Sequence, residues 1–272
     1  WGLGEAIVKN NSIENLIGHD EIESYLIAND PSKHLDIAEI LVKAGKNVLI
    51  EKPIDISIDK IENFYQLTKN KKNIIHVVNQ NRFDPFYINI KKKLEKQIKI
   101  SKNTKFANLT MFFYRDNKYF NHPNKWKKNY SCPLINQGIH FLDLMMWFFG
   151  DFLDVTSLSQ KDNKELKLHD NIVGSVKFKN NILLNIFAST SIKRNEVNFE
   201  FFCEDWIINF NKNNSSSKLK TLLTFSKSQF DLFSNQCELF IKSIESQDTK
   251  KNNILEAYNA VRLSKRLNNS KN

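Results

Sequence analysis

The stretch IANDPSKHLDIAEILVKAGKNVLIEKP, residues 27–53, decides the fold of this chain. It begins as the end of a strand, continues as a helix that Pro31 opens and Gly45 closes, and ends in the apolar strand NVLI followed by EKP. Proline suits the first turn of a helix, and glycine suits the left-handed position that ends one. Two strands joined by a helix form a parallel pair, so this stretch predicts an α/β fold.

The α/β pattern continues on both sides of this stretch. We predict a short helix through Ile17 that Ser12 caps, and a longer helix that Ser57 caps. The segment IIHVVNQ, residues 74–80, reads as a third buried strand, and the next helix begins near Pro85.

The chain changes character after Lys105. Four longer strands, KFANLTMFFY, NIVGSVKF, ILLNIFAST and VNFEFFC, follow one another with polar turns between them, which predicts a largely antiparallel sheet. Two amphipathic helices, over residues 228–246 and 253–267, complete the chain. We therefore predict an α/β part followed by an α+β domain with a large, mainly antiparallel open sheet.

Composition narrows the class of protein. The 272 residues carry a formal net charge of +10, but most positive charge is lysine in polar stretches rather than arginine, the better reader of bases and phosphates. We therefore expect no nucleic-acid partner and treat such binding as the weakest hypothesis. No apolar run is long enough to span a membrane and no signal peptide is visible, so we expect a cytoplasmic protein without membrane contact. The three cysteines lack metal-ligand spacing, and we predict no metal site.

Lys52 is the first candidate for chemistry. It stands at the carboxyl end of the strand NVLI, and open parallel sheets bind ligands at that edge. Pro53 restricts Lys52 to an extended conformation and permits a cis peptide bond, which would aim the side chain in a fixed direction. The alternative is a solvated surface lysine.

The second candidate is the segment LINQGIHFLDLMMWFFG, residues 134–150, which reads as one buried helix. Asn136, His140 and Asp143 recur at i, i+4 and i+7 and would share one face of it. Gly138 would lie inside the helix, where it would let a ligand or a backbone segment approach. Three aligned polar groups indicate a site, although a buried hydrogen-bond network is the alternative.

Together these motifs resemble those of a known family. The segment of residues 27–54, the segment NQNRFDP, the helix of residues 134–150 and the segment HDNIVGSVKFKNNIL resemble, in order and spacing, the signatures of the glucose-fructose oxidoreductase / inositol dehydrogenase / MocA family. The resemblance implies that residues 1–83 form part of a Rossmann domain that binds NAD or NADP. It implies that residues 84–272 form a C-terminal domain for substrate and oligomer contacts.

The resemblance also implies roles for single residues. Lys52 matches the family's catalytic lysine and His140 its histidine acid/base, while Asn136 falls where many members carry a catalytic aspartate. The residues expected beside the cofactor are Ala28, Asn29, Asp30, Pro31, His34, Glu51 and Lys52. Those expected beside the substrate are Arg82, Trp126, Asn136 and Asp143.

The chain departs from the family pattern near its start and before its buried helix. Members begin with a strand and a Gly-rich turn that holds the pyrophosphate, whereas GLGEAI, residues 2–7, lacks a small third residue and a preceding strand. We therefore expect the first βαβ unit to be missing. Ser131 and Cys132 stand where two glycines are expected before Pro133.

The function that follows is oxidation or reduction of a secondary alcohol or ketone, in which the cofactor takes hydride while a base takes the hydroxyl proton. Asn136 cannot act as a base, which concentrates proton transfer on His140 and Lys52. We expect a sugar, cyclitol or nucleotide-sugar substrate, and Asn136 favours an enzyme of the UDP-N-acetylglucosamine 3-dehydrogenase type. We also expect a homo-oligomer, a dimer or tetramer, through the C-terminal sheet. The alternative is a non-catalytic, truncated family member that acts as a binding or assembly subunit.

Overall fold

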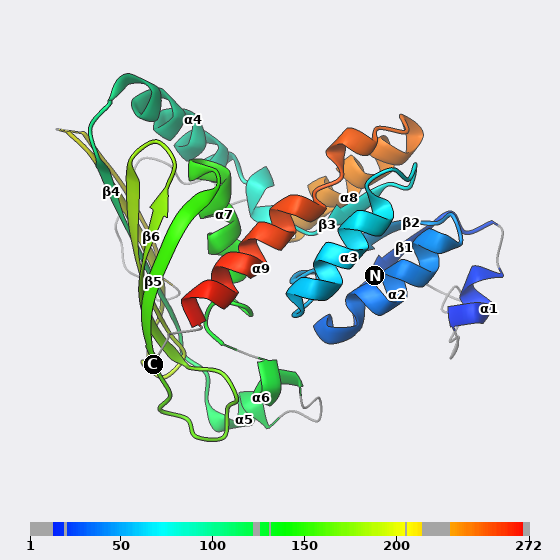
Figure 1. Cartoon of the computed structure of the whole chain (residues 1–272), viewed down its shortest axis with the longest axis horizontal. Helices are drawn as coiled ribbons and strands as arrows, with labels where there is room; N and C mark the ends of the chain where they lie inside the picture. Colours follow the sequence, from blue (N-terminus) through cyan, green and yellow to red (C-terminus); the bar gives the residue numbers. More distant parts are fainter. Residues whose placement is uncertain are drawn as a thin grey trace.

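The computed structural model describes residues 13–18, 21–121, 126–130, 132–204, 206–213 and 229–268. These residues form two sheets, and Figure 1 shows the helices α7 (Ile139–Phe149) and α9 (Ile254–Asn268) lying between them. The helix α1 (Ile13–Ile17) forms as predicted, whereas the predicted capping residue Ser12 lies outside the described residues.

The first sheet is parallel, as the sequence predicts. Its three strands lie in the order β1-β2-β3, with Ile27 beside Ile50 and Ile50 beside Val77. The elements of this part are, in chain order, β1 (Ser24–Ile27), η1 (Pro31–Lys33), α2 (His34–Lys43), β2 (Asn47–Ile50), α3 (Ile58–Thr68), β3 (Ile75–Val77) and η2 (Gln80–Phe83).

Helices of this part begin and end at the capping residues that the sequence predicts. Gly45 has a φ of 82°, the left-handed conformation that closes α2. Ser57 Oγ accepts a backbone N–H from the first turn of α3 at 3.4 Å, and Asp84 Oδ1 does the same at 2.8 Å for the helix that begins at Pro85.

Both faces of the first sheet are covered. Val48 and Ile50 belong to the main core with α2 and α3, whereas Leu49 points the other way and packs with Phe240 of α8 (Gln229–Glu245). Because side chains alternate along a strand, a strand with both faces covered is apolar at every position, as NVLI nearly is.

The second sheet is large and mainly antiparallel, with the order β5-β6-β7-β4-β8-β9 and a single parallel pair, β4 with β7, among the described residues. Its strands are β4 (Lys105–Phe113), β5 (Phe152–Gln160), β6 (Asn171–Phe178), β7 (Ile182–Ser189), β8 (Asn195–Cys203) and β9 (Trp206–Asn213). The two edge strands, β5 and β9, were not among the predicted strands.

The inner face of the second sheet holds an aromatic core. The ring of Phe149, at the end of α7 (Ile139–Phe149), lies 5.4 Å from Phe178 and 5.7 Å from Phe201, measured between ring centroids. The helix is buried, as its sequence predicts. The other helices are α4 (Pro85–Ile100), α5 (Asn117–Phe120), α6 (Trp126–Tyr130), η3 (Thr249–Lys251) and α9 (Ile254–Asn268).

The helix α7 begins later than predicted, because residues 134–138 form a turn instead of its first turn. Gly138 is therefore the N-cap of α7 and not a position inside it. Its N–H donates to the Pro133 carbonyl at 2.8 Å, and a Cβ on Gly138 would lie only 2.6 Å from that oxygen. The group that approaches Gly138 closely is therefore the backbone carbonyl of Pro133.

The C-terminal segment returns to the first sheet, where its side-chain amides complete the free edge of β3. Asn252 Oδ1, Asn253 Oδ1 and Gln236 Oε1 accept alternate backbone N–H groups over residues 75–79, at 2.8, 2.7 and 3.1 Å. The helix α9 then packs on α3, α7 and β5. The division at residue 84 stays a prediction, and α8 and α9 lie against elements of both predicted parts.

Candidate active site

The carboxyl ends of β1 and β2 are tied together by His34. This side chain is 1% exposed, with Nδ1 2.9 Å from the Pro53 carbonyl oxygen and Nε2 3.2 Å from that of Asn29. Asp30 accepts from the N–H and hydroxyl of Ser32 and so fixes the turn after β1. Of the residues expected beside the cofactor, His34 and Asp30 thus shape the loops.

The remaining expected cofactor residues lie at the same edge of the sheet. Ala28 and Asn29 are exposed, Pro31 is buried in η1, and Glu51 accepts the Lys52 N–H at 3.0 Å. The edge therefore offers exposed backbone from the loop after β1 and two charged side chains from the end of β2.

Lys52 points from the end of β2 toward the second part of the chain. The Lys52–Pro53 peptide bond is cis, as the sequence permits. Lys52 Nζ donates a hydrogen bond to the Asn136 carbonyl oxygen at 3.2 Å, and Asn136 lies in the turn before α7. Burial lowers the pKa of Lys52, and the neighbouring Glu51 carboxylate opposes that change. The lysine is therefore easier to deprotonate than a solvated one.

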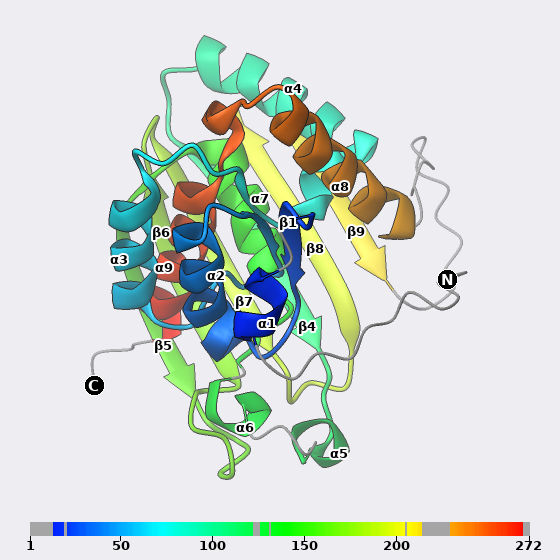
Figure 2. The ribbon, with the colours of Figure 1, turned by 90° about the vertical axis from the view of Figure 1, so that its right-hand side faces the viewer.

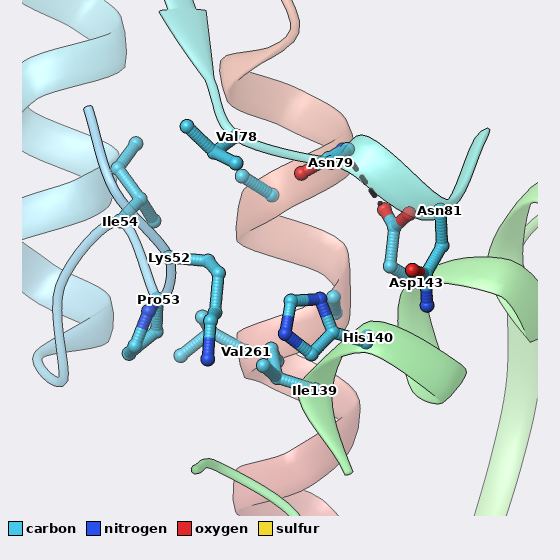
Figure 3. Close-up of a pocket in the computed structure, with 12 residues that line it drawn as sticks. Lys52, Pro53, Ile54, Val78, Asn79, Asn81, Ile139, His140, Asp143 and Val261 are labelled. Carbon is cyan, nitrogen blue, oxygen red and sulfur yellow. Dashed lines mark hydrogen bonds between the residues drawn. The ribbon is translucent and has the colours of Figure 1, made fainter. Parts of the chain in front are cut away.

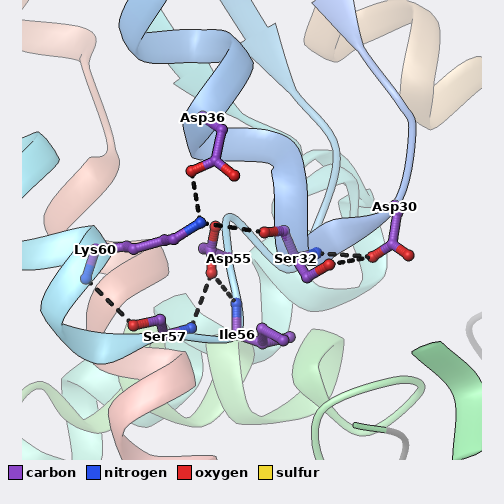
Figure 4. Close-up of polar contacts among 7 residues, drawn as sticks. All are labelled: Asp30, Ser32, Asp36, Asp55, Ile56, Ser57 and Lys60. Atoms are coloured by element: carbon purple, nitrogen blue, oxygen red, sulfur yellow. Dashed lines mark hydrogen bonds and ion pairs between the residues drawn. The ribbon is translucent and has the colours of Figure 1, made fainter. Parts of the chain in front are cut away.

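The loop after Lys52 is held by its own polar groups (Figure 4). Asp55 is fully buried, and its Oδ1 accepts the two backbone N–H groups that follow it, at 2.7 and 2.9 Å. Burial raises the pKa of Asp55. Lys60 binds both Asp36 and the Ser32 carbonyl, which joins α3 to the start of α2. These contacts fix the backbone that carries Lys52.

His140 lies in the first turn of α7 and lines the same pocket as Lys52 (Figure 3). The pocket also includes Asn79 and Asn81, which follow β3, and its floor is formed by apolar side chains of α9. Its enclosed volume is about 20 Å³, enough for about one water molecule. The structure thus brings together two of the three predicted catalytic residues from segments 88 positions apart.

Asp143 and Arg82, both expected beside the substrate, bind each other. Arg82 donates from Nε and Nη2 to the two oxygens of Asp143, at 2.8 and 2.7 Å, and Asn79 Nδ2 adds a third bond at 3.0 Å. Burial raises the pKa of the Asp143 carboxyl, and the Arg82 guanidinium offsets part of that rise. This geometry supports a positioning role for the pair.

Asn136 does not share a helical face with His140 and Asp143, because it lies in the turn before α7. The predicted stripe is wrong at this position, although Asn136 still meets the site. Its carbonyl binds Lys52, and its side-chain amide donates to the hydroxyl of Tyr119.

Two further sequence-based expectations fall partly outside what the structure describes. Trp126 begins α6, but its side chain, like Ser131, lies outside the described residues. Cys132 is buried, and its Sγ accepts the Ile135 N–H at 3.4 Å, so it helps to shape the turn before α7.

Sequence reasoning missed Asn79, Asn81 and Tyr119. The strand-end rule that singled out Lys52 applies equally to the two asparagines after β3, so that signal was present. Tyr119 carries no such signal, because it reaches Asn136 through a four-residue helix that sequence patterns do not reveal.

The described residues contain no group of three or more His, Cys, Asp and Glu side chains placed to hold a metal ion. Within that same part of the chain, every helix is too short or too polar to cross a membrane.

Two family models match the sequence. The model described as oxidoreductase family, NAD-binding Rossmann fold, matches residues 5–79, and the GFO/IDH/MocA C-terminal domain matches residues 104–208. The chain therefore belongs to the GFO/IDH/MocA family of oxidoreductases, as the sequence resemblance predicts.

Individual relatives agree with this assignment. Oxidoreductase P35 of Formosa agariphila is 28% identical over 187 residues, which are 62% of this chain and 53% of that protein. The chain thus spans about half the length of the curated relatives it matches. The WlbA dehydrogenase of Bordetella pertussis, solved with NADH and UDP-GlcNAcA, has a TM-score of 0.78 at 16% identity, over 94% of this chain and 79% of that one. Myo-inositol 2-dehydrogenase of Lactobacillus plantarum has a TM-score of 0.75 at 15% identity, over 94% of this chain and 80% of that one. The solved structures share the fold of this chain.

The strand ends fit the nicotinamide end of a dinucleotide. Exposed backbone at Ala28 and Asn29 and the amides of Asn79 and Asn81 supply hydrogen-bonding groups at one edge of a parallel sheet. Lys52 stands at the same edge, where burial lowers its pKa and the Glu51 carboxylate opposes that change.

Proposed function

We propose that this chain carries the catalytic centre of an NAD- or NADP-dependent dehydrogenase. The substrate is a secondary alcohol or ketone of a sugar, cyclitol or nucleotide sugar, with a UDP-N-acetylglucosamine-type sugar as the favoured case. The observation that carries the proposal is that Lys52 and His140, from different parts of the chain, line one pocket at the carboxyl edge of the parallel sheet.

A bound nicotinamide supplies the hydride acceptor, and the residues of the chain manage the proton. His140 is the base that takes the hydroxyl proton, since imidazole titrates near neutral pH. Lys52 donates a hydrogen bond to the same oxygen and polarises the hydroxyl, while the proton passes to His140. The Asn136 side chain, whose amide donates to Tyr119, orients a hydroxyl without exchanging its proton.

The position of His140 depends on the segment around it. The bidentate Arg82 contact holds Asp143, which lies one turn further along α7, against the loop after β3. The α7 helix is otherwise buried in apolar side chains, so this ion pair sets how its first turn faces Lys52.

A second candidate is a binding or assembly subunit without catalysis. The outer face of the second sheet favours it, since Phe106, Leu158 and Ile207 are 54%, 76% and 59% exposed there. A homo-oligomer through this face, a dimer or tetramer, is compatible with either function.

The test measures turnover and cofactor binding together. In a version that carries the family's Gly-rich phosphate loop, titration with NADH and NADPH should show binding of one of them. With the oxidised form of that cofactor, a panel of myo-inositol, D-glucose and UDP-N-acetylglucosamine should reveal which class of alcohol is oxidised. His140→Ala and Lys52→Ala should each lower kcat by about two to four orders of magnitude, with a much smaller change in cofactor affinity.

The matched control is Lys43→Ala, which removes a lysine of the exposed pair with Glu39 on α2 and should leave kcat within about twofold. If neither cofactor binds and no substrate reacts, the assembly subunit becomes the better explanation. If His140→Ala keeps normal turnover but lowers the melting temperature, the histidine is structural and the catalytic assignment fails.

A further inference from the structure

The pocket that Lys52 and His140 share is a small chamber of about 20 Å³. It lies between the loop after β3, the first turn of α7 and the helix α9, and Figures 1 and 2 both show α7 and α9 side by side. A cavity needs roughly 10 to 15 Å³ to hold a water molecule, so this chamber has room for one water and not for a sugar or a nicotinamide ring. The body of the substrate therefore binds outside the chamber.

The lining of the chamber is apolar on the side of α9 and polar elsewhere. Ala257, Ala260 and Val261 of α9 are all nearly fully buried. The polar lining includes Asn79 and Asp143, which are 8% and 5% exposed. A water molecule stays in a cavity where roughly two to four polar groups hold it, so the polar lining decides what the chamber binds.

Asn79 presents a hydrogen-bond acceptor to the chamber. Its backbone N–H donates to Gln236 Oε1 at 3.1 Å, and its side-chain Nδ2 donates to Asp143 Oδ1 at 3.0 Å. Because Nδ2 faces the carboxylate, Oδ1 faces the other way, and Figure 3 shows this oxygen turned toward the interior of the pocket. No described residue donates a hydrogen bond to Asn79 Oδ1, which can therefore accept one from a ligand.

Asp143 presents a second acceptor. A carboxylate has about four acceptor sites, and three of those of Asp143 are filled. Oδ1 accepts from Asn79 Nδ2 and Arg82 Nη2, whereas Oδ2 accepts only from Arg82 Nε among the described residues. A water in the chamber can therefore donate one hydrogen to Asn79 Oδ1 and the other to Asp143 Oδ2.

His140 stands between this polar lining and Lys52. Figure 3 shows one ring nitrogen of His140 on the side of Lys52 and the other on the side of Asn79. A neutral imidazole carries its hydrogen on one nitrogen only. A water that donates both of its hydrogens to Asn79 and Asp143 can only accept from His140, so it places the imidazole N–H on the nitrogen that faces Asn79.

We propose that the chamber binds a single water that joins His140 to Asn79 and Asp143, and that Asn79 is a positioning residue that acts through this water. The water holds His140 in the tautomer whose lone pair faces Lys52 and the substrate hydroxyl. This inference rests on the proposed function and names what prepares its base.

The physical reason is that a general base needs a lone pair on the side of the proton that it takes. In the other tautomer the nitrogen beside Lys52 already carries a hydrogen and cannot accept the hydroxyl proton. The hydrogen bond of one ring nitrogen sets the state of the other. Without the water the two tautomers mix, and only part of the protein is competent at any moment.

The direct test needs no turnover. A crystal structure of the chain should show one water in the chamber and should identify which ring nitrogen of His140 faces it. NMR of the protein labelled with ¹⁵N-histidine, at about pH 8 where an ordinary imidazole is neutral, should then show the hydrogen on that nitrogen. The His140 signals are assigned by their absence from His140→Ala.

Variants of the lining connect the water to the reaction, in the version that carries the phosphate loop. Ala260→Val adds two methyl groups to the lining and should expel the water. We expect kcat to fall by about tenfold, with KM and cofactor affinity within about twofold and no loss of melting temperature. Ala260→Ser is the matched control, because it leaves room for hydrogen bonding and should keep kcat within about twofold.

A double variant separates this role from a structural one. Asn79→Leu removes the acceptor and should lower kcat at least as much as Ala260→Val. Because both changes act on the same water, the double variant should lose no more activity than Asn79→Leu alone. If Ala260→Val lowers the melting temperature by several degrees, Asn79→Leu and the NMR measurement decide the question.

Three outcomes would overturn the inference: the chamber holds no water in the crystal, the hydrogen of His140 lies on the nitrogen that faces Lys52, or the losses in the double variant multiply. Failure of the proposed function looks different. In that case the water and the His140 tautomer are found as expected, but no alcohol is oxidised.

Discussion

At the scale of single residues, the Arg82 and Asp143 pair shows what a buried charge beside the site requires. The side chains are 17% and 8% exposed, and the carboxylate receives two bonds from Arg82 and one from Asn79. A buried ion pair adds little net stability, but removal of one partner leaves the other charge in an apolar place.

We therefore expect Asp143→Ala to destabilise the protein by about 3 to 5 kcal/mol, measured as a change in the free energy of unfolding by urea. Asp143→Asn keeps the shape and part of the hydrogen bonding and should cost less. The control is Glu39→Ala, which breaks the exposed Lys43 pair on α2 and should cost about 0.5 kcal/mol or less. If Asp143→Ala and Glu39→Ala lower the free energy of unfolding by the same amount, the buried pair matters no more to stability than the exposed one.

Single residues of the candidate site were predictable where a general rule placed them. Lys52 follows from the strand-end rule, and His140 follows from a polar group on an otherwise apolar helix. Asn136 was placed on the wrong element, because the sequence does not reveal that the Gly138 N–H closes a wider turn onto Pro133. Tyr119 was not predictable, since its contact depends on tertiary packing.

At the scale of elements, the contact between β3 and α8 contains an unusual group. His76 is 1% exposed on β3, its ring centroid is 5.4 Å from that of Phe240, and neither ring nitrogen has a hydrogen-bond partner among the described residues. Burial, with a smaller contribution from Lys251, lowers the pKa of His76 to about 4.

This burial makes the docking of α8 sensitive to acid. In the unfolded chain His76 regains its ordinary pKa of about 6.5, so between about pH 6.5 and pH 4 the unfolded state binds more protons than the folded state. The contribution of His76 to stability is therefore complete above about pH 6.5 and is lost as the pH falls through that window. We expect His76→Leu to flatten the fall in the urea midpoint between about pH 7 and pH 5.

The control for this experiment is His169→Gln, at a half-buried histidine bonded to Ser159 beside the second sheet, which should leave the acid sensitivity as in the parent chain. A His76→Leu protein whose midpoint falls with acid as steeply as the parent would contradict the assignment.

Elements were predictable in proportion to their periodicity. The parallel strands, their crossover helices and the inner strands of the second sheet carry clear patterns, and the structure confirms them. The strand β5 was missed because its sequence, FLDVTSLSQ, mixes polar and apolar residues. It is an edge strand and has one neighbour in the sheet, β6. The strand β9 was missed because it runs into the polar patch of Asn and Lys residues.

At the scale of the whole molecule, the second sheet presents two faces of different character. Figure 1 shows α7 and α9 on one side of it and no described helix on the other. On that other side Leu183, Phe106, Phe202 and Ile207 stand in one register row across four strands. An apolar row of this kind on a sheet face is typical of a protein interface.

We expect two copies of the chain to associate through this face. Phe106→Lys should place a charge in the row and shift the chain from dimer or tetramer to monomer, as measured by sedimentation equilibrium. Leu255→Lys is the control, because Leu255 is similarly exposed at 45% but lies on α9, and it should leave the mass unchanged. A parent chain that is already monomeric at micromolar concentration would refute the expectation.

The side-chain amides on the edge of β3 have a consequence for the order in which the protein is made. The parallel sheet is synthesised first, but the acceptors for its last strand come from Gln236, Asn252 and Asn253, at separations of 157 to 177 residues. While those residues are still inside the ribosome, the edge of β3 is open to any other strand that can pair with it. A nascent chain therefore exposes this edge until residues 236–253 have left the ribosome, and folding of the parallel sheet is complete only after that.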